Sequence, residues 1–301
     1  PIKAKMHPET IICRRTFLPM NLNQPGTLYI VATPIGNLAD MVPRAVTTLH
    51  NVSVIACEDT RHSKKLLSQF SIDTPCITYH DYTDQKSVDK ILTRLQHSED
   101  VALISDAGTP LISDPGYRLV AQARLRGFHV IPIPGACAAT AALSVSGLPT
   151  DKFRFLGFLP AKVGQRKKAL EELKAVTETL VFYEAPHRIL ASLNDLIDVF
   201  GQDRLAFMAR EVSKTFETYL YGTISQIKTQ VNNDSNQQRG EIVIIIAGNT
   251  DSTYTHTPET ESLVALLLKE LPITKAASLA AKITGGDKKQ LYQVALSLQN
   301  K

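Results

Sequence analysis

Four short stretches of small, turn-forming or acidic residues each follow an apolar run in this sequence. They are residues 33–37 (TPIGN), 58–61 (EDTR), 106–110 (DAGTP) and 134–139 (PGACAA). Glycine, proline and aspartate form turns, and glycine lets the backbone approach a ligand closely. If the apolar runs are parallel strands, all four stretches lie at the carboxyl edge of one sheet, where open α/β sheets bind ligands. The pattern predicts a ligand crevice.

The chemistry of these stretches restricts the ligand. The sequence has no GxGxxG after its first apolar run and no GxxxxGK[ST], so the usual dinucleotide and nucleotide-triphosphate cradles are not indicated. The stretches offer mainly backbone groups and carboxylates. This composition favours a ligand with a purine-like edge and a positive charge over a polyphosphate.

Two aspartates of the stretch 105–116 (SDAGTPLISDPG) have different predicted roles. Asp106 directly follows an apolar run, so its carboxylate is expected in the crevice, where it would offset a positive charge. Asp114 precedes Pro115 and is expected only to shape the chain before the next helix.

The apolar runs are predicted strands at residues 27–32, 52–57, 75–79, 101–105 and 129–133. Amphipathic segments at 87–96 and 117–126 alternate with them, and Gly127 is a candidate C-cap for the second. This alternation predicts a mostly parallel sheet that is covered on both faces.

The pattern changes after Thr150 to that of a mixed α/β domain. Strands are predicted at 154–159, 180–183, 205–211, 215–221 and 241–247, with helices at 166–174 and 188–200. The adjacent strands around Ser213 and Lys214 predict an antiparallel hairpin, and the polar stretch 232–239 (NNDSNQQR) is expected to be a solvated loop.

We therefore predict an α/β protein with domains at 26–147 and 148–250. Residues 252–258 are interpreted as a linker, and 259–301 as a small helical tail with a turn at Gly285, similar to a helix-turn-helix. The tail could serve packing or dimerisation as well as nucleic-acid binding. Residues 1–25 lack a secretory signal and are interpreted as a disordered or spurious extension; a transit peptide is conceivable.

Composition adds few constraints. No apolar run approaches the roughly 20 residues that cross a bilayer. The four cysteines form no CxxC pair, which argues against a zinc site or a disulfide framework and fits a reducing cytoplasm. The net charge is +4, but residues 1–25 contribute +3 of it, so overall charge does not argue for a nucleic-acid partner.

The motifs ATPIGNL, CEDTR, SDAGTPLISDPG, PGACAATAALSVSGLP, FLP, YEAPHR, ARE and GEIVIII occur in this order between residues 26 and 248. Together they resemble the tetrapyrrole methylase superfamily of S-adenosylmethionine-dependent methyltransferases. Within it, they are most similar to the bacterial small-subunit ribosomal RNA 2′-O-ribose cytidine methyltransferases. The resemblance implies methylation of a cytidine ribose in the decoding region, a homodimer, and S-adenosylmethionine in a cleft between two α/β domains, without a metal.

The resemblance also implies site residues, motif by motif. Cofactor-binding residues would be Pro34, Ile35, Gly36, Asp106, Gly108, Thr109, Pro110, Gly135, Ala136 and Cys137 in the first domain, with Tyr183 and Glu241 in the second. Candidates for the chemistry are Glu184, His187, Glu211 and Lys214, and none is singled out as a general base. A mechanism that works mainly by positioning is an alternative.

Candidate RNA contacts are Arg61, Lys162, Arg166, Lys167, Lys168, Arg188 and Arg210. The cations of 162–168 stand at the start of a predicted helix, where the helix dipole disfavours positive charge, so a functional role and a merely solvated charge run are weighed equally. For Arg61, a local ion network with its acidic neighbours is an equal alternative.

Two other functions remain open at this stage. One is methylation of a small tetrapyrrole, of a modified protein histidine or of another substrate of the superfamily. The other is a non-catalytic protein that binds RNA through its tail. The basic segment 162–168 and the helical tail favour RNA as the substrate.

Overall fold

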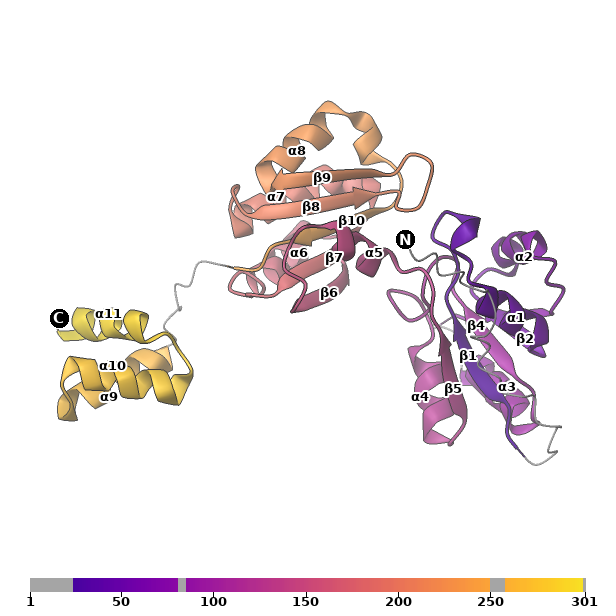
Figure 1. Cartoon of the computed structure of the whole chain (residues 1–301), viewed down its shortest axis with the longest axis horizontal. Coiled ribbons are helices and arrows are strands. Elements are labelled where there is room, and N and C mark those ends of the chain that lie inside the picture. Colours follow the sequence, from indigo (N-terminus) through magenta and orange to yellow (C-terminus); the bar gives the residue numbers. More distant parts are fainter. Residues whose placement is uncertain (1–23, 81–84, 250–257, 300–301) are drawn as a thin grey trace, which may run out of the picture. The chain divides into compact units, whose positions relative to one another are not determined.

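The structure, a computed structural model, describes residues 24–80, 85–249 and 258–299 (Figure 1). It divides into two compact units. The first extends to Ala141 and includes the segment Val212–Phe216, and the second comprises Ala142–Glu211 and the residues from Glu217 onward. Most of the predicted N-terminal extension and the predicted linker lie outside the described residues.

The first unit is built on a five-stranded sheet with the order β3-β2-β4-β1-β5, and every neighbouring pair is parallel. Its strands are β1 (Thr27–Val31), β2 (Val54–Cys57), β3 (Cys76–Thr78), β4 (Val101–Ile104) and β5 (His129–Ile133). The helices are α1 (Pro43–Asn51), α2 (Thr60–Gln69), α3 (Gln85–Gln96), α4 (Tyr117–Leu125) and the start of α5 (Ala138–Val145), with a 3-10 turn, η1 (Leu38–Asp40). The predicted parallel sheet is confirmed.

Helices cover both faces of this sheet, as continuous apolar strands require. All residues of β2 and β4 are buried. On one face α3 and α4 pack with residues such as Val54 and Leu103, and on the other α1 and α2 pack with residues such as Ile55 and Ile104. The carboxyl ends of the strands therefore remain as the edge that can form a site.

The second unit contains a mixed sheet with the order β6-β7-β10-β8-β9. Its strands are β6 (Phe153–Phe158), β7 (Thr179–Glu184), β8 (Leu205–Arg210), β9 (Thr218–Thr223) and β10 (Ile242–Ile246). Only the β6–β7 pair is parallel. The antiparallel hairpin predicted around Ser213 and Lys214 is confirmed as β8–β9.

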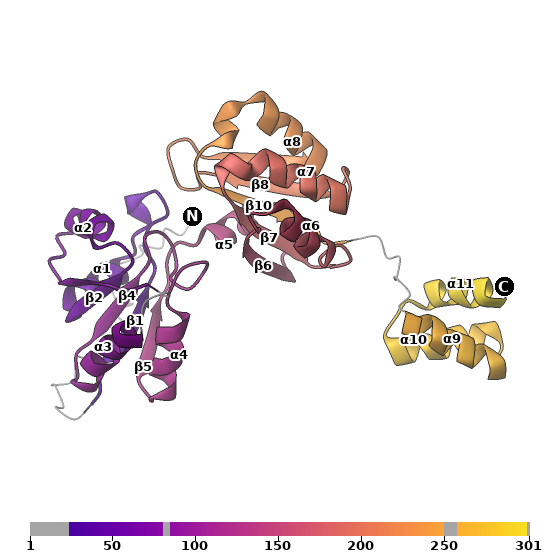
Figure 2. The same cartoon turned by 180° about the vertical axis from the view of Figure 1, so that it is seen from behind.

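Helices α6 (Val163–Glu171), α7 (Ile189–Phe200) and α8 (Ile224–Asn233) pack on one face of this sheet (Figure 2). Two 3-10 turns, η2 (Pro186–Arg188) and η3 (Ser235–Gln238), complete the unit. The stretch 232–239 is not the solvated loop that its composition predicted. It forms the end of α8 and η3, because Gln237 is buried and its side chain is hydrogen-bonded to Thr218 and Asp234.

The opposite face of the second sheet carries aromatic side chains. Tyr183 meets the rings of Phe155 and Phe158 edge-on, at centroid distances of 4.9 and 5.6 Å. Phe158 and Tyr221 are more than half exposed. This aromatic face lies on the side of the sheet opposite α6, α7 and α8.

The tail forms a three-helix unit of its own from α9 (Pro258–Glu270), α10 (Ile273–Thr284) and α11 (Lys288–Gln299). A small core that includes Val264, Ala280 and Leu291 holds it together. Gly285 ends α10 in the left-handed conformation, with φ of 70°, as the predicted turn requires. Among the described residues, no helix is both long and apolar enough to span a membrane.

Two of the cations at the start of α6, Arg166 and Lys167, pair with carboxylates on α7, which the sequence did not reveal. Arg166 is 2% exposed, and its Nε lies 2.7 Å from Asp195 Oδ2 on α7. Its Nη1 also donates to the carbonyl of Ala161, and Lys167 pairs with Asp198 at 2.7 Å. The burial of Arg166 conflicts with its predicted role as an RNA contact, and we assign it a structural role.

Replacing Arg166 with alanine should lower the free energy of unfolding by about 3–5 kcal/mol, because it leaves the Asp195 carboxylate buried without its partner. Lys168→Ala is the matched control on the same helix, and since Lys168 is exposed its effect should stay within about 0.5 kcal/mol. Urea unfolding followed by circular dichroism measures both. Equal stabilities for the two variants would contradict the structural role.

Candidate functional site

Backbone hydrogen bonds join the loops that follow β1 and β4. The N–H of Thr33 donates to the carbonyl of Gly108 at 2.9 Å, and the N–H of Gly108 donates to the carbonyl of Thr33 at 3.1 Å. The hydroxyl of Thr33 donates to the backbone carbonyl of Ser105, and the hydroxyl of Ser105 donates to the backbone carbonyl of Gly108. The two predicted cofactor loops are thus tied together.

The loop after β5 joins the same group. The Thr109 hydroxyl donates to the carbonyl of Ala136 at 2.9 Å. A Cβ atom at Gly135 would stand 2.8 Å from the Cβ of Ala32, so this close approach needs glycine. Gly108 has φ of 86°, which also favours glycine. The ten cofactor-binding residues predicted in the first domain therefore all lie in three loops at one edge of the sheet.

Three carboxylates, from Glu58, Asp106 and Asp114, form an acidic cluster at this edge. Burial raises the pKa of Asp114 to about 6, and the charges of Glu58 and Asp106 act in the same direction. Asp106 Oδ1 is buried and has no hydrogen-bond partner among the described residues. Carboxylates that repel one another, with one oxygen unpaired, favour a ligand that brings positive charge or hydrogen-bond donors.

The stretch 105–116 is more constrained than a simple turn. Leu111 and Ser113 adopt positive φ values of 73° and 66°, which are uncommon for residues with a side chain. Such strain is concentrated at functional sites. Asp114 was predicted only to shape the chain, but its interaction with Asp106 and Glu58 makes it part of the acidic cluster.

The segment Val212–Phe216 belongs to the first unit and reaches the loop after β1. The Ser213 hydroxyl donates to the carboxylate of Asp40, and Ser213 has a positive φ of 70°. The side chain of Lys214 lies so close to Gly36 that any Cβ there would overlap it. Of the four candidates for the chemistry, Lys214 is thus the one that the described structure places against a predicted cofactor loop of the first unit.

Glu184 is held in place within the second unit. It is 1% exposed and accepts hydrogen bonds from the Ser192 hydroxyl, from Arg188 Nη2 at 2.6 Å and from the backbone N–H of Ala185 at 2.7 Å. Its register partner Ile242 belongs to the helix-covered core, so Glu184 points to that face. These three contacts hold the Glu184 carboxylate in place and give it a structural role.

Arg210 lies in the same row of the sheet and is 7% exposed. Its Nε donates to Thr218 Oγ1 at 3.1 Å. This burial conflicts with the predicted RNA contact, because the guanidinium is committed to the interior. Arg210 and Glu184 both pair with Ile242, so the strand register places these two charged residues on the face of the sheet that the helices cover.

Glu211 also supports a neighbouring segment. Its carboxylate accepts the N–H of Glu241 at 2.8 Å, and its own N–H donates to the Glu241 carbonyl at 2.9 Å. Glu211 has a positive φ of 55°. Tyr183, next to Glu184, points to the opposite, aromatic face.

The remaining predicted residues differ in exposure. Arg61, Lys162, Lys168 and His187 are exposed. Arg188 is half-buried and paired with Glu184, and its Nε is buried without a partner in the described residues. Arg61 stands in the first turn of α2, where its backbone N–H donates to the N-cap carboxylate of Asp59 at 2.7 Å.

Sequence reasoning missed the contributions of Asp40 and Ser213, and it underestimated Asp114. Asp40 and Ser213 are 173 residues apart in the chain, and no local pattern relates them. The only available signal for Asp114 was its presence with Asp106 in one loop.

Two family models match the chain. The model for tetrapyrrole (corrin/porphyrin) methylases matches residues 27–228, and the one for the RsmI C-terminal HTH domain matches residues 255–299.

Curated relatives match almost the whole chain. A Pseudomonas aeruginosa protein named ribosomal RNA small subunit methyltransferase I is 52% identical over 92% of this chain and 99% of its own length. The protein of that name from Escherichia coli O157:H7 is 46% identical over 92% of this chain and 97% of its own.

Solved structures share the fold at much lower identity. The uroporphyrin-III-C-methyltransferase of Thermus thermophilus has a TM-score of 0.52 and 17% identity, over 74% of this chain and 94% of its own. A diphthine synthase has a TM-score of 0.52 and 13% identity, over 73% and 89%. The parallel sheet, its tied loops and these matches agree: the chain belongs to the tetrapyrrole methylase family.

Proposed function

We propose that this protein is an S-adenosylmethionine-dependent methyltransferase of small-subunit ribosomal RNA, which methylates the ribose 2′-hydroxyl of a cytidine in the decoding region. The observation that carries this proposal is the 52% identity, over 92% of this chain and 99% of the relative, to a protein named ribosomal RNA small subunit methyltransferase I. The match of the tail to the RsmI C-terminal HTH model supports the same substrate class.

The first unit fits the proposed cofactor. When bound, S-adenosylmethionine supplies a methyl group on a positively charged sulfur. The acidic cluster of Glu58, Asp106 and Asp114 provides charge of the opposite sign, and the unpaired Asp106 Oδ1 provides an acceptor. The loops that contain Gly108 and Gly135 would present their backbone groups to the ligand at the sheet edge, because these glycines allow the loops to pack closely on Ile35 and Ala32.

Methylation of a hydroxyl requires alignment of the oxygen with the methyl group and loss of the hydroxyl proton. Glu184 and Glu211 both use their carboxylates to hold the protein itself. Lys214 lies against the Gly36 loop. We therefore assign Lys214 the role of orienting the ribose, since an ammonium close to the 2′-oxygen or its phosphate favours the alkoxide form. His187 is exposed and is a second candidate to take up the proton.

RNA binding is assigned to exposed cations. Arg61, Lys162 and Lys168 can reach phosphates, and Lys167 and Arg188 keep partly exposed side chains beside their ion-pair partners. These contacts would position the RNA without reading its sequence. We also propose that the protein acts in the cytoplasm as a homodimer, which the exposed Phe158 and Tyr221 of the aromatic face support.

A small tetrapyrrole is the second candidate substrate. Two structural neighbours, named uroporphyrin-III-C-methyltransferase and cobalt precorrin-4 methyltransferase, share 17% and 13% identity with this chain, which supports only the common fold. The 52% identity to a ribosomal RNA methyltransferase and the match of the tail both favour RNA.

Incubation with labelled S-adenosylmethionine and small ribosomal subunits that lack the modification should label a cytidine at its 2′-oxygen. Nucleoside analysis by mass spectrometry identifies the position. Label on a base, on a porphyrinoid substrate only, or on no substrate would contradict the proposed function.

The same assay, combined with a measurement of S-adenosylmethionine affinity, tests whether Lys214 acts in methyl transfer or in cofactor binding. Lys214→Met keeps the aliphatic chain against Gly36 and removes the charge, so methyl transfer should slow at least about tenfold while S-adenosylmethionine affinity stays unchanged. Loss of both together would mean that the residue only maintains the loop.

Asp106→Asn should weaken S-adenosylmethionine binding roughly tenfold, or about 1.4 kcal/mol, because it removes one charge from the acidic cluster. Its melting temperature should stay equal or rise, since repulsion of Asp114 also falls. Isothermal titration calorimetry and thermal melts measure the two effects, with the exposed Asp73→Asn as control. A parallel loss of affinity and stability would identify Asp106 as a structural cap.

Cofactor affinity should depend on pH through Asp114. Its pKa of about 6 means that it is largely neutral at pH 5 and charged at pH 7. A cationic ligand binds better to the charged form, so affinity should rise as the pH rises through 6, and binding should release protons there. Titrations at pH 5, 6 and 7 test this. Asp114→Asn should abolish the rise, and a wild-type affinity that falls with pH would refute the assignment.

A further inference from the structure

A second cluster of reactive groups lies in the first unit, at the free edge of its sheet. β3 is the edge strand beside β2. Cys76 on β3 is the register partner of Ile55, and Cys57 stands two residues further along β2. Because side chains two residues apart share a face, both thiols point to the side covered by α2. Cys57 is fully buried and Cys76 is half-buried.

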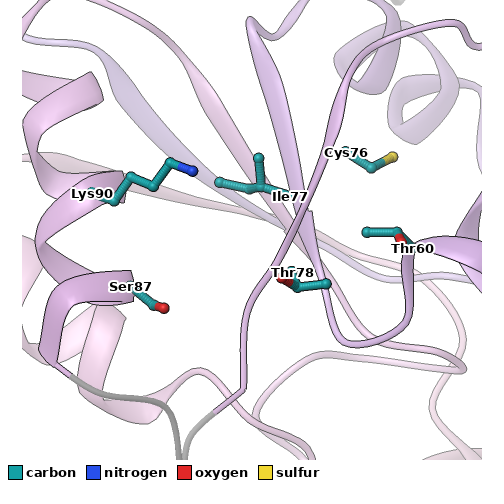
Figure 3. Close-up of a pocket in the computed structure, with 6 residues that line it drawn as sticks. All are labelled: Thr60, Cys76, Ile77, Thr78, Ser87 and Lys90. Carbon is teal, nitrogen blue, oxygen red and sulfur yellow. The ribbon is translucent and has the colours of Figure 1, made fainter.

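Cys76 also lines a cavity of about 330 Å³ at this edge (Figure 3). Thr60 from α2, Ile77 and Thr78 from β3, and Ser87 and Lys90 from α3 form the rest of its lining. In Figure 3 the side chain of Lys90 extends from α3 toward β3. The cavity therefore gives a small polar molecule access to the strand that carries Cys76.

The surroundings of Cys76 favour its thiolate. A hydrogen bond from the Cys57 thiol lowers the pKa of Cys76 to about 7, and the nearby ammonium of Lys64 acts in the same direction against the effect of burial. The pKa of Cys57 moves the opposite way, because of its interaction with the Cys76 side chain and its burial, and its Sγ donates to the carbonyl of Ile77 at 3.7 Å. The pair thus consists of a fully buried cysteine and a half-buried one whose pKa is lowered, and a lowered pKa at a partly exposed site is typical of reactive cysteines.

We propose that Cys76 is a modification site: its thiolate is oxidised by small hydroperoxides that enter the cavity between α2, β3 and α3. The sulfur attacks one oxygen of hydrogen peroxide, a sulfur–oxygen bond forms as the oxygen–oxygen bond breaks, and the leaving hydroxide becomes water after protonation by solvent. Sulfur is oxidised by two electrons and the peroxide is reduced. The product is the sulfenic acid of Cys76, beside the Cys57 thiol that can condense with it and release water.

Cys137 is an internal control for this reactivity, because it is also half-buried in the first unit, and among the described residues no interaction with a second cysteine is seen there. The full chain is treated with iodoacetamide between pH 5.5 and 9.5, and separately with hydrogen peroxide and dimedone. Peptide mass spectrometry then follows each cysteine. This readout is independent of the proposed methyl transfer, so failure of one does not affect the other.

Cys76 should be alkylated with a pH midpoint near 7 and should carry the dimedone adduct, or the disulfide to Cys57, after peroxide. Lys64→Gln removes one cause of thiolate stability at an exposed position, so the midpoint should rise and alkylation at pH 7 should slow. Cys57→Ala should raise the pH midpoint of Cys76 alkylation further. If Cys57→Ala does not fold, Lys64→Gln alone still tests the proposal. A Cys76 midpoint above about 8.5, the value of a free thiol, or adducts on Cys137 but not on Cys76, would overturn the proposal.

Discussion

The two backbone hydrogen bonds between Thr33 and Gly108 hold together the loops on which the candidate site depends. They join the ends of β1 and β4, which are neighbours in the sheet, and they require the left-handed conformation of Gly108. Asp106 stands between Ser105, which is hydrogen-bonded into this arrangement, and Gly108. Its Oδ1 is buried, and its carboxylate lies near Asp114. The parallel sheet supplies the edge, and this bridge joins its loops into the candidate binding surface.

In the second unit, the charged residues at the ends of the strands form hydrogen bonds and ion pairs within the protein. Glu184 and Arg210 share one row of the mixed sheet and face the helices, so each needs a buried partner. Glu211 then holds Glu241 from a strained backbone conformation. The cations that remain exposed, such as Arg61, Lys162 and Lys168, are therefore our candidates for contact with RNA. The contacts of Glu184 and Arg210 also show that the position of a residue in a motif does not reveal which of its neighbours in the fold it contacts.

Most of the architecture could be predicted from the sequence. Short continuous apolar runs such as 101–104, bounded by turn residues, indicate strands buried on both faces, and Ser213-Lys214 between two apolar stretches indicates a hairpin. The positions of the loops at the carboxyl ends of the strands in the first sheet also followed from the sequence, and the rule that ligands bind there makes them the candidate cofactor loops.

Other features depend on contacts between distant residues, which local patterns do not encode. Arg166 resembles its exposed neighbour Lys168 in sequence, and only Asp195, 29 residues away, makes it a buried structural cation. Gln237 sits in a polar stretch but is hydrogen-bonded into the second unit. Cys57 and Cys76 lie 19 positions apart in the sequence, and the pairing of β2 with β3 brings them together. In each case a partner from another element decides what the side chain does.

A crystal structure of the protein with S-adenosylmethionine tests the central claim most directly. The account predicts that the ligand lies at the carboxyl edge of the first sheet, against Gly108 and Gly135, with Asp106 Oδ1 accepting a hydrogen bond from it. A ligand bound away from these loops, or one that leaves Asp106 Oδ1 without a partner, would contradict it.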